Sequence, residues 1–158
     1  MMDFDFSLIT AVATVIGVIG GLISVIFLVY EIRRNAQAIE GSTVQSLMSL
    51  EAQIFATILT HAGLYLRGCV KSPDLTEAEA FQFEVLVGGI MSLTYSAYVQ
   101  HQQGLIDQEV WQAYVNALNG RLSNHGFLEC WRSIQTSYPQ TFQLAIDQIL
   151  PVTVLPSA

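Results

Sequence analysis

The side chains able to bind a metal or to move protons are few and scattered. The histidines are His61, His101 and His125, and the only thiols are Cys69 and Cys130. No two histidines have the short spacing that places two ligands on one helix face, and the cysteines form no CxxC or Cys/His pattern. His125 and Cys130 lie close in sequence, but two weak ligands do not make a site. We therefore predict no metal site.

Catalytic patterns are equally sparse. The sequence has no Gly-x-Ser-x-Gly elbow, and Gly88-Gly89 is not followed by the Gly-Lys-Ser/Thr of a phosphate-binding loop. The carboxylates Glu77, Glu79 and Glu84 gather where a helix begins, a position that the helix dipole already favours. We predict no catalytic residue and no cofactor, and we rank an enzyme below the non-catalytic alternatives.

The overall charge argues against a nucleic-acid partner. The 158 residues carry six Lys and Arg against 13 Asp and Glu, a formal net charge of −7. Proteins that neutralise phosphates need clustered basic residues. Charged residues make up only 12% of the chain, against roughly 25% in an ordinary soluble domain, and the mean hydropathy is +0.46. Part of the chain is therefore expected to lie in lipid.

The lipid-embedded part is predicted at the N-terminus. Residues 6–30 contain no charged side chain, and at about 1.5 Å per residue they can cross a hydrocarbon core of roughly 30 Å. We predict a transmembrane helix there, within an N-terminal segment 1–34. A cleaved signal peptide is the alternative, but it needs a basic start and small residues at its end. Here the residues before the apolar run include the acidic Asp3 and Asp5, and the run ends in bulky residues such as Phe27 and Leu28. We therefore expect the segment to stay uncleaved.

The flanks of the span predict its orientation. Arg33 and Arg34 follow the apolar run, and no Lys or Arg precedes it. Because positive charge marks the cytoplasmic flank, we expect the N-terminus outside and the C-terminal domain in the cytoplasm. Tyr30, Arg33 and Arg34 are the predicted membrane-interface anchors, in contact with lipid headgroups.

Small residues recur inside the span at intervals that favour helix packing. Such rows let two backbones approach closely in lipid, although glycine is also simply tolerated in transmembrane helices. We interpret the row as a packing seam for another copy of the chain or for a different membrane protein. The predicted seam consists of Ala13, Gly17, Gly20, Gly21 and Ser24.

Beyond the span, residues 35–150 follow helical periodicity, and 151–158 form a C-terminal tail. A stripe of apolar residues continues the first helix, with a break expected at Gly41-Ser42; the stripe predicts either a self-association seam or a face packed on the domain. Its members are Ile32, Ala36, Ile39, Val44, Leu47, Leu50, Ile54 and Ile58. Residues 61–74, with Gly63, Gly68 and Pro73, are expected to form a helix end and a loop.

Three later helices are bounded by capping signals. Thr76 and Glu79 form a capping box for a helix that is expected to end near Gln103, with Gly104 as its left-handed cap. Asp107 is expected to cap the next helix, and Pro139 to open the last one. A shorter helix is expected over residues 125–137. Pro151 is expected to end the last helix, and no segment alternates with the period of a strand.

The expected fold is therefore all-α, with one N-terminal transmembrane helix continuing into a cytoplasmic bundle of about four to five helices. Residues 85–106 lack Asp, Glu, Lys and Arg, so a second membrane span is the alternative to a central buried helix. Gln100, Gln102 and Gln103 at its end favour the buried helix. Gly88, Ser92 and Ser96 recur at intervals of four and predict that another helix crosses this one closely. The aromatic residues Trp111 and Trp131 are expected to be core or interface anchors.

Four segments together resemble a widespread group of uncharacterised bacterial single-span membrane proteins. The segments are FLVYEIRRNAQAI at residues 27–39, QHQQGLIDQEVWQAY at 100–114, GFLECW at 126–131 and YPQTFQLAIDQIL at 138–150. The group's pattern often has two aromatic residues where this chain has Cys130-Trp131. The resemblance covers nearly the whole chain and implies a bacterial inner-membrane anchor. It implies no activity.

These observations favour a non-catalytic accessory or scaffold subunit, which assembles with itself or docks on a larger inner-membrane complex. The first alternative is a helical module that binds a hydrophobic ligand such as a lipid, quinone or pigment. A membrane-bound enzyme or signalling receiver, tested by changing His101, is the remaining alternative.

Overall fold

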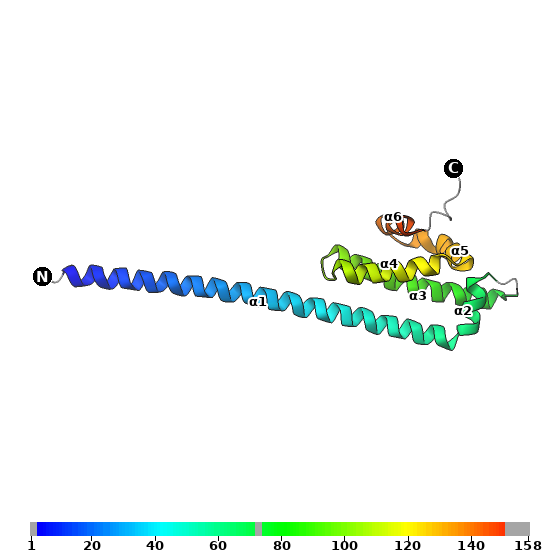
Figure 1. The fold of residues 1–158 in the computed structure, drawn as a ribbon, viewed down its shortest axis with the longest axis horizontal. Helices are drawn as coiled ribbons and strands as arrows, with labels where there is room; N and C mark the ends of the chain where they lie inside the picture. The colour runs from blue at the N-terminus through cyan, green and yellow to red at the C-terminus, as the bar shows by residue number, and fades with distance from the viewer. Residues whose placement is uncertain (1–2, 72–73, 151–158) are drawn as a thin grey trace. The chain divides into compact units, whose positions relative to one another are not determined.

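The computed structural model describes residues 3–71 and 74–150, and side chains from Leu8 onward. The described residues are helical throughout, with short turns and no strand. They form six α-helices and one short 3-10 helix (Figure 1). The chain divides into two compact units, Met1–Gly41 and Ser42–Ala158. The expected tail at 151–158 and the stop at Pro151 lie outside the described residues.

The first unit is a single helical segment. Helix α1 runs over Asp3–Thr60 and so passes from the first unit into the second without the break expected at Gly41-Ser42. An isolated glycine costs a helix only about 1 kcal/mol relative to alanine, which is too little to interrupt so long a run of hydrogen bonds. The unit boundary nevertheless falls between these two residues.

In the second unit, the last part of α1 packs on the domain along one face. Leu47 is 1% exposed, and Val44, Ile54 and Ile58 are partly buried against the core. Leu50, which the sequence placed on the same stripe, is 46% exposed. The packing alternative is therefore correct for the buried members of the stripe beyond Ser42.

The helix end and loop expected over residues 61–74 are correct in part: α1 ends at Thr60, but Ala62–Cys69 form helix α2. Gly68 is a packing glycine and not a helix breaker. A methyl group at this position would overlap the ring of Phe83, so the glycine lets α2 lie close against α3, over Glu77–Gln102. Lys71, just after α2, has a positive φ of 52°.

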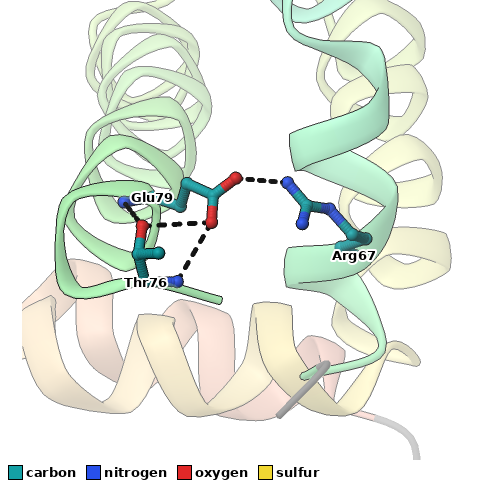
Figure 2. A network of polar contacts seen from close by, with 3 residues as sticks. All are labelled: Arg67, Thr76 and Glu79. Atoms are coloured by element: carbon teal, nitrogen blue, oxygen red, sulfur yellow. Dashed lines mark hydrogen bonds and ion pairs between the residues drawn. The ribbon is translucent and has the colours of Figure 1, made fainter. Parts of the chain in front are cut away.

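Helix α3 is the central helix of the second unit and contacts α2, α4 and α5. Its start is fixed as predicted: the Thr76 side chain accepts from the Glu79 amide, and the Glu79 carboxylate accepts from the Thr76 amide at 3.0 Å. The same carboxylate pairs with Arg67 of α2 (Figure 2). At the other end, Gly104 has the predicted left-handed conformation, with φ +68°.

Of the two alternatives for residues 85–106, the second unit shows the buried helix and not a second membrane span. Val87, Met91 and Ala97 are completely buried, and α1 is the only helix among the described residues that is long and apolar enough to cross a membrane. The close helix crossing expected over Gly88, Ser92 and Ser96 is not found at Gly88. A methyl group at Gly88 would meet nothing within 4 Å.

The remaining helices close the core. Helix α4 covers Gln108–Leu122 with the predicted Asp107 cap, whose carboxylate accepts from the Val110 amide at 2.8 Å. Helix α5 covers His125–Ile134 and continues as the 3-10 helix η1, Gln135–Ser137. Helix α6 covers Gln140–Ile149, so Pro139 precedes the first helical residue.

Aromatic rings dominate the centre of the core. Trp131, Phe127 and Phe142 are 1%, 0% and 0% exposed. The Phe142 ring lies in edge or tilted contact with Tyr95, Tyr98, Trp131 and Tyr138 at centroid distances of 5.1–6.0 Å. Each such pair adds about 0.5–1.5 kcal/mol beyond area burial, so this cluster contributes to holding α3, α5 and α6 together.

Candidate functional site

The apolar surface of α1 is the most unusual feature of the first unit. Sixteen large apolar or aromatic side chains between residues 8 and 32 are 46–69% exposed. The most apolar window of the helix has a mean hydropathy of 2.7, and none of it is buried. A core helix of a soluble protein passes the same length test but is mostly buried. This segment is therefore long and apolar enough to span a membrane.

Two hydroxyl groups of this segment are satisfied within the helix. The Thr14 hydroxyl donates to the Thr10 carbonyl at 2.8 Å, and the Ser24 hydroxyl donates to the Gly20 carbonyl at 2.9 Å. In a hydrocarbon environment, an unpaired polar group costs several kcal/mol. The hydrogen bonds of these two hydroxyls remove that cost.

The predicted seam lies open along the helix. Methyl groups built on Gly17, Gly20 and Gly21 would meet nothing within 4 Å, and Ala13 and Ser24 are exposed. The backbone at these positions is accessible to a partner helix. The predicted anchors are also exposed: Tyr30 at 62%, with Arg33 and Arg34 beyond it.

In the second unit, an apolar groove of about 210 Å³ lies between α1 and α4. Its walls are formed by Val44, Leu47 and Met48 of α1 and by Val110, Ala113, Tyr114 and Ala117 of α4. Of these residues, Val44 and Leu47 belong to the apolar stripe predicted from the sequence. The periodicity of each face gives no sign that the two surfaces leave a space between them.

Glu51 is the one charged residue of this groove and was not singled out from the sequence. Burial raises the pKa of the Tyr114 phenol, and the negative charge of Glu51 raises it further. Tyr114 therefore stays protonated and can donate a hydrogen bond. The groove thus combines apolar walls with one carboxylate and one phenol.

The two cysteines are free thiols in different surroundings. Cys69 is 7% exposed, and burial raises its pKa. Burial, with a smaller contribution from the charge of Glu84, raises the pKa of Cys130 to about 11. Both thiols are therefore protonated near neutral pH and are poor nucleophiles.

The three histidines lie apart and have structural partners or solvent around them. The His101 ring stacks on Trp111 at 5.8 Å, with an interplanar angle of 10°. His125 Nε2 lies 3.2 Å from a Glu129 carboxylate oxygen, and the other carboxylate oxygen of Glu129 pairs with Lys71. His61 is exposed. Across residues 3–71 and 74–150, His, Cys, Asp and Glu form no group of three or more that could hold a metal ion.

The two predicted aromatic anchors differ in burial. Trp131 is 1% exposed and belongs to the core, whereas Trp111 is half-buried beside Tyr98 and His101. No sequence pattern singled out Tyr138. Its hydroxyl donates to the Gly88 carbonyl at 3.3 Å and lies 3.2 Å from the Ser92 hydroxyl, so its phenol covers part of the small-residue row of α3.

Comparisons with known proteins add no further constraint. No family model matches the chain, and no match emerges among curated proteins or solved structures. The function must therefore be argued from the exposed surface of α1 and from the groove in the second unit.

Proposed function

We propose that this protein is a membrane-anchored, non-catalytic scaffold or accessory subunit of the bacterial inner membrane. Residues 6–30 cross the bilayer with the N-terminus outside, and the helical domain lies in the cytoplasm. Small residues of the span pack against another copy of the chain or against a membrane complex. This proposal includes the kinship, inferred from sequence, with uncharacterised bacterial single-span proteins.

The exposed apolar surface of α1 is the observation that carries the proposal. Transfer of one large apolar side chain out of water is worth about 1.5–3 kcal/mol. Sixteen such side chains are exposed between residues 8 and 32, so leaving them in water would cost tens of kcal/mol on that scale, more than the typical stability of a domain of about 5–15 kcal/mol. Lipid removes this cost, and Arg33 and Arg34 then reach the anionic headgroups on the cytoplasmic side.

The open glycine row supports the assembly part of the proposal. Lipid tails are as apolar as leucine, so helices associate in membranes through close packing and not through the hydrophobic effect. Gly17 and Gly21 leave the backbone uncovered, which permits that close approach. A leucine at either position would hold a partner helix away.

The test is the native mass of the full chain, extracted from its own membrane in a mild detergent. Wild type is expected as an oligomer or within a larger complex, and the double variant Gly17→Leu/Gly21→Leu is expected to lose mass. The matched control, Val15→Leu/Ile19→Leu, adds leucines on another face and should leave the mass unchanged. A monomeric wild type would refute the assembly role. An N-terminal tag inaccessible to protease on spheroplasts would refute the orientation.

A second candidate function rests on the groove between α1 and α4. An engineered cavity of about 150 Å³ binds benzene, so a groove of about 210 Å³ accommodates a small apolar group or part of an acyl chain. In this alternative, the domain binds a hydrophobic ligand. A ligand that co-purifies with wild type, is lost in Ala113→Phe and is kept in the exposed neighbour variant Gln112→Phe would support it. Equal ligand content in all three proteins would exclude it.

A further inference from the structure

A carboxylate and a phenol line the apolar groove of the second unit without a hydrogen-bond partner. Glu51 and Tyr114 are both half-buried there. Within residues 3–71 and 74–150, neither polar group takes part in a hydrogen bond or an ion pair. The negative charge of Glu51 acts on the Tyr114 phenol, so the two groups lie near each other. Polar groups that leave bulk water usually find a partner in the protein, and these two remain available to a ligand.

The basic side chain at the end of the groove is engaged elsewhere. Past Ala117 the groove continues into a space of about 20 Å³, which Glu51, Phe55 and Arg121 help to line. The Arg121 guanidinium lies over the Phe55 ring, with its central carbon 5.7 Å from the ring centroid. In the described part of the chain it forms no ion pair with Glu51. The carboxylate in the groove therefore keeps its capacity to pair with a cation.

The second unit as a whole also favours a positively charged ligand. Residues 42–150 contain nine carboxylates and four basic side chains. The field of an acidic domain raises the local concentration of cations and lowers that of anions. Both the groove and its surroundings therefore select for positive charge.

The volume of the groove limits the size of the ligand. Val44, Leu47 and Met48 of α1 offer apolar contact, and Ala113 and Ala117 of α4 contribute only methyl groups. The space of about 210 Å³ is smaller than the roughly 300–1,000 Å³ of pockets for drug-sized ligands. It holds one short apolar group and not the two acyl chains of a membrane lipid.

We propose that this groove binds a soluble amine with a short apolar chain. The chain lies between the apolar walls, and the protonated amine donates to the Glu51 carboxylate and to the Tyr114 phenol oxygen. Hydrogen bonds between charged groups are roughly twice as strong as neutral ones, and the face of a tyrosine ring also attracts cations. This inference rests on the second candidate function, because it names the class of hydrophobic ligand that the domain binds.

Three probes of equal chain length test the charge of the ligand. Hexylamine, hexanol and hexanoate are positive, neutral and negative near neutral pH. Their binding to the full chain in phosphatidylcholine nanodiscs is measured by titration calorimetry, and the heat on empty nanodiscs is subtracted. We expect hexylamine to bind at least about tenfold more tightly than hexanol, and hexanoate to bind most weakly. Equal affinities for hexylamine and hexanol would overturn the proposal.

Substitutions at the carboxylate assign the effect to the groove. Glu51→Gln keeps the shape of the side chain and should lower the affinity for hexylamine about tenfold. An unchanged affinity for hexanol would show that the groove is intact. Tyr114→Phe removes the second acceptor and should weaken hexylamine a few-fold. The matched control is Glu109→Gln, in the first turn of α4 and outside the groove, which should change neither affinity. An equal loss in Glu51→Gln and Glu109→Gln would overturn the site, because net charge alone would then attract the amine.

A second set of nanodiscs distinguishes a soluble amine from a lipid headgroup. Phosphatidylethanolamine carries the same primary amine on a membrane lipid. An unchanged affinity for hexylamine in phosphatidylethanolamine nanodiscs would support a soluble ligand. Loss of hexylamine binding there would show that the lipid headgroup occupies the groove, and would overturn the proposal.

These outcomes separate the amine from the proposed functions. If Ala113→Phe weakens all three probes but Glu51→Gln weakens none, the groove binds a hydrophobic ligand and the amine is refuted. If no probe binds and no ligand co-purifies, the second candidate function fails as well. If no probe binds and Ala113→Phe lowers the native mass, a protein covers the groove and the amine is again refuted. The scaffold role is tested separately by Gly17→Leu/Gly21→Leu and does not depend on these results.

Discussion

Two glycine-to-alanine substitutions in neighbouring helices should change stability in opposite directions. Gly126 lies in the first turn of α5, where a methyl group would overlap the Gly68 carbonyl oxygen and lie 3.0 Å from the Cys69 carbonyl oxygen. Gly120 lies inside α4, and a methyl group there would meet nothing within 4 Å. The chemical change is the same, so any difference reports the local environment.

The expected magnitudes follow from these surroundings. Alanine is better than glycine in a helix interior by about 0.8–1 kcal/mol, and Gly120→Ala should gain roughly that amount. At Gly126 the obstructing atoms are the backbone of α2, which cannot rotate away as a side chain can. Overpacking costs typically about 1–3 kcal/mol. After the helical gain is subtracted from this cost, Gly126→Ala should lower the free energy of unfolding by up to about 2 kcal/mol.

Urea unfolding of the full chain in lipid nanodiscs, followed by tryptophan fluorescence, measures this difference. Trp131 is 1% exposed in α5 and reports loss of the core. With a slope of about 2 kcal/mol/M, a difference of about 1–3 kcal/mol between the variants separates their midpoints by roughly 0.5–1.5 M. A Gly126→Ala protein as stable as Gly120→Ala would refute the close approach of α2 and α5.

Three further changes test other contacts. Cys130, with its pKa raised to about 11, should be alkylated at pH 8 about a hundredfold more slowly than an ordinary thiol with a pKa near 8.5, as measured by intact mass; a normal rate would contradict its burial. The Thr76 amide and Arg67 hold the pKa of Glu79 below its ordinary value, so its stabilising effect is present above the unfolded pKa and is lost as the pH falls through the folded pKa. Glu79→Gln should therefore flatten the fall in urea midpoint between about pH 5 and pH 3, and an unchanged pH dependence would contradict that role. Tyr138→Phe removes the hydroxyl that bonds to the α3 backbone at 3.3 Å and should cost about 0.5–1.5 kcal/mol in thermal unfolding; no loss would mean that water replaces the bond.

Local signals in the sequence predict local structure well in this chain. The capping box of Thr76 and Glu79, the Asp107 cap and the left-handed Gly104 are all confirmed. Each depends on residues within a few positions of one another, so the pattern contains all the groups that interact. The all-helical fold follows from the same kind of evidence, namely apolar periodicity over single segments.

Features that depend on distant residues could not be predicted. Gly68 indicates a break when only its neighbours are considered, but its lack of a side chain makes room for Phe83 of another helix. The row of Gly88 and Ser92 predicts a crossing helix, whereas one phenol, Tyr138, provides the cover. The groove beside Glu51 is likewise a space between two helices. Each of these three features depends on contacts between different helices, so the residue spacing within one segment cannot predict it.

Helix α1 illustrates why the same exposure has different meanings along one chain. Ile26 is 69% exposed and Leu59 is 75% exposed, yet the two residues lie in different patterns. Around Ile26 the apolar residues cover every side of the helix, which is the pattern of a segment long and apolar enough to cross a membrane. Around Leu59 one side is buried on the domain and the other is neutral. The same exposed fraction therefore indicates an all-round apolar surface in one segment and the solvent side of a packed helix in the other.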